Sequence, residues 1–391
     1  MCKNGVVMNR YYLMNKNEKI IEFDVQEKLG GEICSEIQSF SKIRPIGFSD
    51  IHTWIIQRDY AKHKEHLKRW LYEWGIDTIQ GFINVTHCLG LNDAFWVKSI
   101  NSSLIWDEIN LYQNPFDDVA QHTAFDTGLY GLKLSSTSPE FTAEGSFAKC
   151  WIQKNDTVVL YKQGATGASN VGLEPYAEYL SSNIGHQIFG DKVLPYGLEM
   201  FKDRLCSVCN LFTTEEIGFV PFYRVLPQNR AYTIEALIKF CRELGFEQDF
   251  RRMILLDSIV FNQDRHTGNF GFMVENETQR IISFAPLFDF NVSMLCNAVP
   301  EDLLDYDKYE KEYMVGHKLG GLFSEVGAGI MTDDLRQQLP EQIELPHHPL
   351  YNMDSNRLKQ LQKIVDRNYD KVINKSSICI VKNREERSPK M

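Results

Sequence analysis

The chain has 391 residues, of which 43% are hydrophobic and 24% charged, the composition of an ordinary soluble globular protein with room for two or three domains. No apolar run approaches the roughly 20 residues that cross a bilayer, so no membrane partner is expected. A formal net charge of −10 disfavours general attraction to nucleic acid or anionic membranes. The first residues lack the apolar centre of a signal peptide, and a cytoplasmic protein is expected.

Residues 1–120 are expected to form an accessory region, and residues 1–115 to be largely helical and rich in tryptophan. Leu67, Trp70, Leu71 and Trp74 recur at helical spacing and predict one apolar helix face. The basic residues within Lys62–Arg69 suit a nucleic-acid or acidic partner, but a solvated helix face is the simpler interpretation.

Residues 121–213 have strand character interrupted by glycine and turn clusters. The pattern predicts strand-like runs at 142–152 and 157–162 around a turn at Asn155-Asp156, a helix at 174–188 and further strand at 200–212.

Nine cysteines are scattered along the chain, and reduced, mostly buried thiols are expected. Cys206 and Cys209 have the spacing of a redox pair or half a zinc site, but no second ligand pair follows at the expected spacing. Their flanks predict a buried strand instead.

Residues 214–391 are expected to be mainly helical. Apolar periodicity predicts helices at 234–244, 250–261, 332–339 and 355–372, with short strands at 270–274 and 281–285 around a turn at 275–277. Strand-rich and helix-rich regions that follow each other along the chain predict an α+β fold.

The stretch Asp264-Arg265-His266-Thr267-Gly268-Asn269, with Asp289 twenty residues beyond, carries the polar groups of a phosphoryl-transfer site. Asp264 can accept the proton of an attacking hydroxyl, and His266 is a rival because its unperturbed pKa lies near working pH. Asn269 and Asp289 supply the hard oxygen ligands that Mg²⁺ requires. Taken alone, the hexapeptide also fits a simple polar turn, because Asp, Gly and Asn favour turns. The downstream Asp289 and the Gly and Lys features upstream make that alternative weaker.

Asp257 lies one or two helical turns before this stretch and is a weaker candidate, which we expect to tie the preceding helix to the loop.

Residues before this loop are candidates for holding ATP. Gly145, Ser146 and Phe147 lie between strand-like runs, where exposed backbone N–H groups can cradle phosphates, although an ordinary hairpin fits as well. Lys149 is a second phosphate contact, and Lys162 ends an apolar strand from which it can reach the α- and β-phosphates. For either lysine, a snorkelling strand-end residue is the alternative.

Two further features of the nucleotide site are expected, a glutamate that holds Lys162 and a hinge for adenine. Glu178, or Glu174 on the same helical face, would hold Lys162 in place. The segment 210–213, with Leu211 and Phe212 at its centre, is the candidate hinge against whose backbone adenine docks.

Together these residues resemble the HipA-like kinase family, the toxin kinases of bacterial toxin–antitoxin modules and their relatives, over about residues 125–325. The resemblance rests on the loop Asp264–Asn269, the segment Leu287–Asn291, the loop Gly145–Lys149 and Lys162. The Asp-Arg-His order is also similar to phosphatidylinositol kinases, and it reverses the order of ordinary protein kinases.

The resemblance implies a bilobal kinase fold, with a β-rich N-lobe at 121–213 and a mainly helical C-lobe at 214–391. It implies ATP and Mg²⁺ as cofactors, a Ser or Thr hydroxyl of a protein as acceptor, and an antitoxin-like protein as a candidate partner. It also implies autophosphorylation at Thr142 or Ser146, where a phosphate would repel those of ATP. The toxin members carry a β-rich N-terminal subdomain, whereas a helical one is expected here, so toxicity and partner binding do not transfer.

Two other classes stay open. A lipid or small-molecule kinase is suggested by the Asp-Arg-His order, but residues 290–307 contain no Lys or Arg and include Glu301, Asp302 and Asp305, which suits anionic headgroups poorly. A non-catalytic kinase-like binding protein would use the basic stretch at Lys62–Arg69 as its working surface.

Overall fold

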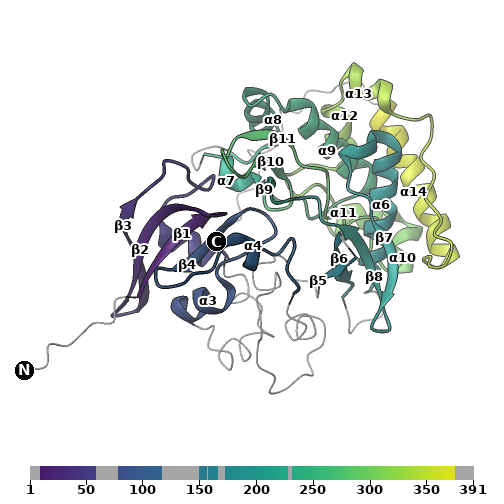
Figure 1. Cartoon of the computed structure of the whole chain (residues 1–391). Coiled ribbons are helices and arrows are strands. Elements are labelled where there is room, and N and C mark those ends of the chain that lie inside the picture. The colour runs from purple at the N-terminus through teal and green to yellow at the C-terminus, as the bar shows by residue number, and fades with distance from the viewer. Residues whose placement is uncertain are drawn as a thin grey trace, which may run out of the picture. The chain divides into compact units, whose positions relative to one another are not determined.

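The computed structural model describes residues 9–58, 78–116, 149–155, 157–165, 172–227 and 231–374, which form helices and antiparallel sheets of a mixed α+β structure (Figure 1). The chain divides into two compact units, each assembled from segments that are distant in sequence. The first contains Met1–Lys162, Val208–Leu226 and Gly271–Ala285, and the second contains Gln163–Ser207, Pro227–Phe270 and Pro286–Met391.

The first unit begins with an antiparallel sheet of strand order β3-β2-β1-β4. Its strands are β1 (Asn9–Asn15), β2 (Glu18–Lys28), β3 (Gly31–Ser39) and β4 (Phe95–Ser99). Residues at alternate positions point to the same face of a strand, so Leu13, Ile21 and Phe23 enter one core. Lys16, at φ 47°, lies in the tight turn that joins β1 to β2.

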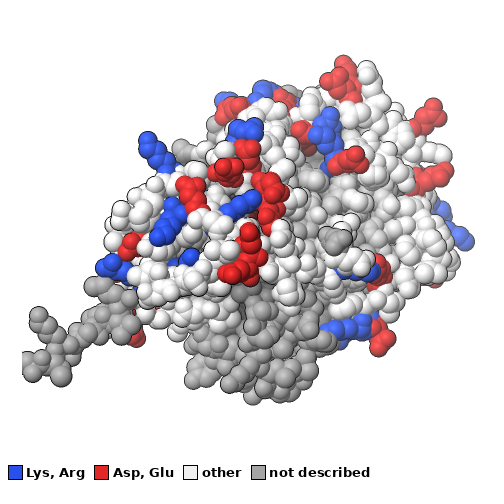
Figure 2. All heavy atoms as spheres, in the orientation of Figure 1, with Lys and Arg blue, Asp and Glu red and all other residues white. Residues whose placement is uncertain are grey.

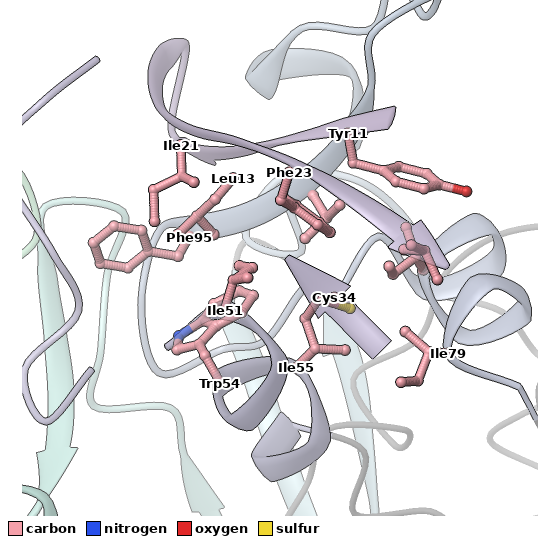
Figure 3. Packing of buried hydrophobic residues seen from close by; sticks show 14 of the residues in the cluster. Tyr11, Leu13, Ile21, Phe23, Cys34, Ile51, Trp54, Ile55, Ile79 and Phe95 are labelled. Carbon is pink, nitrogen blue, oxygen red and sulfur yellow. The ribbon is translucent and has the colours of Figure 1, made fainter. Parts of the chain in front are cut away.

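Two short helices supply the other half of this core. Trp54 and Ile55 of α1 (Ile51–Arg58) and Ile79 of α3 (Ile79–Thr86) pack with the buried strand residues (Figure 3). Thr78 caps α3 by accepting a hydrogen bond from the backbone N–H of Gly81 at 2.9 Å. Burial of large aromatic and branched side chains supplies most of the stabilisation that such a small sheet requires.

The prediction that residues 1–115 are largely helical is wrong for the part of them that the structure describes. Four strands dominate, and α1, α3 and α4 (Trp106–Ile109) are short. Trp54, Trp96 and Trp106 are buried in the cores beside the sheet. The proposed difference from toxin kinases with a β-rich N-terminal subdomain therefore does not hold. The stretch with Leu67–Trp74 and the basic residues lies outside the described residues.

Later segments complete the first unit. β5 (Lys149–Lys154) and β6 (Thr157–Gln163) form an antiparallel pair. A second sheet has the order β11-β10-β9, from β9 (Ile217–Pro221), β10 (Gly271–Glu275) and β11 (Ile281–Phe284), with α7 (Phe222–Val225) after β9. Gly271 allows β10 to lie against β9, because a Cβ atom there would come within 2.1 Å of the Val220 carbonyl oxygen.

The second unit is mainly helical and is organised around α9 (Glu247–Val260). Residues Met253–Val260 of α9 are all buried, because α9 contacts helices on several sides. The helices that contact it are α6 (Glu174–Phe189), α8 (Ile234–Glu243), α12 (Phe323–Gly329) and α14 (Ser355–Asn374).

The second unit also contains the 3₁₀ turn η4 (Gly190–Lys192) and the short helices α10 (Pro300–Leu304), α11 (Tyr306–Glu312) and α13 (Asp333–Gln338). Its strands β7 (Gly197–Phe201) and β8 (Arg204–Asn210) are neighbours in one sheet. The last residues of β8 belong to the first unit.

Glycines set the close packing of α9. A Cβ atom at Gly185 of α6 would lie 2.6 Å from Leu256, and one at Gly327 of α12 would lie 3.0 Å from Ser258. Both distances are tighter than ordinary side-chain packing allows.

The predicted helices of this unit are present, and most ends agree within two residues. The helix expected at 250–261 begins three residues earlier, at Glu247. The strand expected at 200–212 is divided into β7 and β8 by a turn at Lys202 and Asp203, which adopt φ values of 49° and 59°. Such left-handed residues reverse the chain where an uninterrupted strand was predicted.

Cys206 and Cys209 lie buried in β8, as expected, and all seven cysteines of the described residues are buried. Burial raises the pKa of Cys206, Cys241 and Cys296 to about 12. On the face shown in Figure 2, acidic and basic side chains of the described residues are interspersed. Among these residues, no helix is both long and apolar enough to span a bilayer.

Candidate active site

The C-terminus of α9 turns directly into the polar loop at 262–269. Phe261 ends the helix in the left-handed conformation, with φ 57°. The backbone N–H of Asn262 donates to the Asp257 carbonyl at 2.9 Å, and its side-chain amide donates to the Asp257 carboxylate at 2.8 Å. Asp257 therefore ties the helix to the loop, as expected for it.

A fully buried ion pair joins Asp257 to Arg265. The guanidinium donates to both carboxylate oxygens, at 2.9 and 3.0 Å, and both side chains are 0% exposed. Burial alone would raise the pKa of Asp257, but the charge of Arg265, aided by His317, outweighs it and holds that pKa below the usual value. The carboxylate is thus ionised, and the pair is a bidentate, charge-assisted contact.

Arg265 also fixes the backbone on both sides of the site. Its Nη1 donates to the carbonyl oxygens of Asn269, at 2.7 Å, and of Phe288, at 2.6 Å. The guanidinium lies over the ring of Phe290, 5.2 Å from its centroid, a cation–π contact. One side chain thereby joins the loop at 262–269 to the segment around Asp289.

Asn269 brings the predicted catalytic residues together. Its Oδ1 accepts a hydrogen bond from the backbone N–H of His266 at 2.9 Å. Its Nδ2 donates to the backbone carbonyl of Asp264 at 3.0 Å and to the carboxylate of Asp289 at 3.2 Å. Asp264, His266 and Asp289 therefore all contact the side-chain amide of Asn269, although Asp264 and Asp289 are 25 positions apart in the sequence.

Asp289 occupies a backbone conformation that L-residues rarely adopt, with φ 63°. The surrounding contacts hold it there, since the N–H of Gln263 donates to the Val292 carbonyl at 2.9 Å and the N–H of Met294 to Val260 at 2.8 Å. Left-handed residues outside glycine carry a small conformational cost and concentrate at functional sites. Here the conformation places a carboxylate beside Asn269.

Asp264 and His266, the two candidate bases, differ in the contacts of the atoms that would accept a proton. The Asp264 carboxylate is partly exposed and is bonded to Lys318. His266 Nδ1 accepts a hydrogen bond from the N–H of Gly268 at 3.0 Å, so a neutral His266 carries its proton on Nε2. As a base, His266 would have to give up this bond, which favours Asp264.

The donor set suits a hard divalent cation. Asp289 offers carboxylate oxygens, and Oδ1 of Asn269 accepts a single N–H and keeps a second lone pair. Among the residues described, no group of three or more His, Cys, Asp and Glu side chains is placed to hold a metal. Mg²⁺ commonly takes only one or two protein carboxylates and completes its shell with water and phosphate oxygens. Asp289 and Asn269 fit that mode of binding.

The predicted nucleotide contacts lie in both units. In the first unit, Lys162 is buried on β6, opposite Lys149 on β5. In the second, Glu178 is fully buried in α6 and accepts a hydrogen bond from the Ser207 hydroxyl at 2.6 Å. The pairing of Lys162 with Glu178 stays a prediction, and Gly145, Ser146, Phe147 and Thr142 lie outside the described residues.

Leu211 and Phe212, the expected hinge, follow β8 in the first unit. The N–H of Leu211 donates to the Val158 carbonyl at 2.8 Å, and Phe212 packs edge-on against Phe219, with ring centroids 5.6 Å apart. Their role in docking adenine stays a prediction.

No pattern in the sequence points to the loop at 315–322 as part of the site. Lys318 in that loop contacts Asp264, and His317 lies buried with its Nε2 3.7 Å from the Asp257 carboxylate. No motif marks either residue. The pair Gly320-Gly321, with φ values of 101° and 95°, is the local signal of a tight loop, but it does not indicate what the loop contacts.

Comparisons with known proteins give a likeness in structure but not in sequence. No family model matches the chain, and no curated protein matches it. HipA in the Shewanella oneidensis MR-1 toxin–antitoxin complex of HipA, HipB and operator DNA is similar over 92% of this chain and 96% of its own, with 9% identity and a TM-score of 0.48. The Helicobacter pylori proinflammatory kinase CtkA is similar over 57% of this chain and 91% of its own, with 17% identity and a TM-score of 0.46.

Proposed function

We propose that this chain is an ATP- and Mg²⁺-dependent kinase of HipA-like type that transfers the γ-phosphoryl group to a serine or threonine hydroxyl of a protein. The observation that carries the proposal is the amide of Asn269, which bonds to the backbone of Asp264 and to the carboxylate of Asp289. A base and two hard metal ligands that meet at one amide, from the loop at 262–269 and the segment around Asp289, are the protein groups that phosphoryl transfer needs.

The roles follow from the surroundings of each group. Asp289 and Asn269 would hold the cation, and its positive charge would neutralise the phosphates of ATP. Asp264 lies at the exposed side of the loop and accepts the proton of the acceptor hydroxyl. Arg265 is fully buried, so it positions the loop and does not reach substrate. His266 shapes the turn through its bond from Gly268.

The remaining parts of the proposal concern the nucleotide. Lys162, Lys149 and the loop at Gly145–Phe147 bind the phosphates, Glu178 orients Lys162, and the segment with Leu211 and Phe212 receives adenine. The lobes at 121–213 and 214–391, and autophosphorylation at Thr142 or Ser146, belong to the same proposal.

The surface that follows Asp289 favours a protein acceptor over an anionic headgroup. Helix α10 carries Glu301 and Asp302 in its first turn, and Asp305 caps α11 by accepting a hydrogen bond from the N–H of Lys308. Negative charge along this segment repels inositol phosphates.

Radiolabelled ATP with Mg²⁺ tests the proposal. The wild-type chain is expected to label itself or a protein in a mixed lysate. Asp264→Asn should lower the rate about 10²–10⁴-fold, because the general base is lost, with the affinity for ATP unchanged. Asp289→Asn should weaken Mg²⁺-dependent nucleotide binding, measured by calorimetry.

Asp191→Asn removes an exposed carboxylate of the same unit and should leave both measurements unchanged. Failure of the wild-type chain to bind ATP, or full activity of Asp264→Asn, would refute the proposal.

A further inference from the structure

The side chain of Lys318 is bonded to the carboxylate of Asp264, the candidate base. The two residues lie 54 positions apart. Both side chains are partly open to solvent, 45% for Lys318 and 37% for Asp264. The contact between Arg265 and Asp257, by contrast, is closed to solvent.

The loop that carries Lys318 is held by its own backbone. The N–H of Val315 donates to the Glu310 carbonyl at 3.0 Å, and the N–H of His317 donates to the Gly321 carbonyl at 2.9 Å. Gly316 has no room for a side chain, since a Cβ atom there would lie 2.6 Å from the Gly321 oxygen. Lys318 is thus presented from a closed turn.

His317 anchors this turn beside the buried ion pair. Its side chain is 0% exposed, its Nδ1 accepts the N–H of Leu319 at 3.2 Å, and its ring meets that of Phe323 with centroids 6.3 Å apart. With Nδ1 used as acceptor, Nε2 carries the proton and faces the carboxylate of Asp257, 3.7 Å away. The position of Lys318 is therefore set by the residues that also position Arg265.

A cation at this place has a defined electrostatic consequence. An acceptor hydroxyl must lie within hydrogen-bond reach of Asp264 to lose its proton there. The Lys318 ammonium already touches that carboxylate, so it lies near the hydroxyl and the phosphoryl group under attack. A half-exposed ion pair contributes little stability, and an incoming substrate can replace it at small cost.

We propose that Lys318 is a catalytic residue of this site, which rests on the kinase function proposed above. In the transfer, the acceptor oxygen forms a bond to the γ-phosphorus while the bond from that phosphorus to the β–γ bridging oxygen breaks. The proton of the hydroxyl passes to Asp264, and ADP leaves with the electron pair. Lys318 donates hydrogen bonds to the oxygens of the group in transfer, where negative charge is spread.

The test compares Lys318→Gln and Lys318→Arg with the matched control Lys311→Gln, which removes an exposed lysine from α11 of the same unit. Calorimetry measures the affinities for ADP with Mg²⁺ and for ADP with Mg²⁺ and aluminium fluoride, a mimic of the phosphoryl group in transfer. Lys318→Gln should bind the aluminium fluoride complex at least about tenfold more weakly with its affinity for ADP unchanged, and should transfer phosphate about 10²-fold more slowly. Lys318→Arg should recover part of both losses.

The outcomes separate this proposal from the kinase function itself. Wild-type protein that neither binds ADP nor transfers phosphate refutes the kinase. If the wild type is active, unchanged affinity and rate in Lys318→Gln refute the role of Lys318. A higher rate of phosphate transfer in Lys318→Gln would also refute the catalytic role, because it would mean that Lys318 inhibits Asp264 as the base.

Discussion

Asp264 and Arg265 are neighbours in the chain, but their side chains form ion pairs in opposite surroundings. Arg265 and Asp257 are both fully buried, whereas Lys318 and Asp264 are both partly exposed. The buried pair adds backbone bonds to Asn269 and Phe288, while the described contact of the Lys318 ammonium is the one to Asp264.

The difference follows from solvation. A buried pair cannot be opened without leaving a charge in a poorly solvating interior, so it keeps a single geometry. An exposed pair exchanges its partner for water or a ligand at little cost. The buried pair of Arg265 and Asp257 therefore suits a fixed framework. The exposed pair of Lys318 and Asp264 suits a site where a side chain can change its partner.

Arg265→Met should give the largest loss of stability. The variant leaves Asp257 buried without its partner, which we expect to cost about 3–5 kcal/mol of unfolding free energy. Denaturant unfolding at neutral pH measures it. Arg242→Met, on the exposed side of α8, removes an arginine that is bonded to Glu247 at the surface and should leave the midpoint nearly unchanged. Equal midpoints for the two variants would contradict the framework role of Arg265.

The pH dependence of this loss has a definite sign. In the wild type, the folded-state pKa of Asp257 lies below its unfolded value, so the pair stabilises above the ordinary aspartate pKa of about 3.9 and the benefit fades as pH falls. In Arg265→Met, burial without the guanidinium raises this pKa, so protonation relieves the penalty. The stability difference should therefore shrink between pH 7 and about 4. A difference that grows in acid would contradict this account.

His317→Ala should have an intermediate effect. Loss of the buried ring leaves a cavity and frees the turn that carries Lys318, which we expect to cost about 2 kcal/mol. Hydrogen exchange should quicken in residues 315–322 before other parts of the second unit. His186→Ala, at the exposed end of α6, is the control. Unchanged exchange at 315–322 would show that His317 does not anchor the turn.

Glu247→Gln should have the smallest effect, since its ion pairs with Arg242 and Arg251 lie at the surface. The hydrogen bond from Arg242, and then the contact with Arg251, lowers the pKa of Glu247 to about 2. Because solvent screens the group, we expect a loss below about 1 kcal/mol at pH 7. The loss should be complete above the unfolded pKa of about 4.3 and vanish as pH falls towards 2. Thermal unfolding across this range measures it.

The second unit was predictable because its signals are local. Helices such as Ile234–Glu243 and Ser355–Asn374 show apolar residues at helical spacing, and their ends agree closely with the prediction. Asp264 and Asn269 lie within one short motif, so their convergence needs only a single turn of the chain. Asp289 joins them through a neighbouring segment.

The first unit was harder to predict because its pairings are distant. β1 pairs with β4, some 80 residues further along, and no local pattern gives that register. The apolar stripe at Leu67–Trp74 and the many tryptophans led to a helical interpretation of the whole region. Lys318 was missed for the same reason, because its contact with Asp264 arises from the tertiary fold.

The two glycines that flank α9 have a consequence for how the protein tolerates sequence change. Gly185 lies in α6, the helix that also carries Glu178, and Gly327 lies in α12. An added Cβ atom would come within 2.6 Å of Leu256 at the first position and 3.0 Å of Ser258 at the second. An alanine at either position would therefore require side chains of α9 or of its neighbours to shift, close to the helix whose end leads into the loop at 262–269. The packing around α9 thus limits which residues these two positions tolerate, although neither glycine lies in the loop itself.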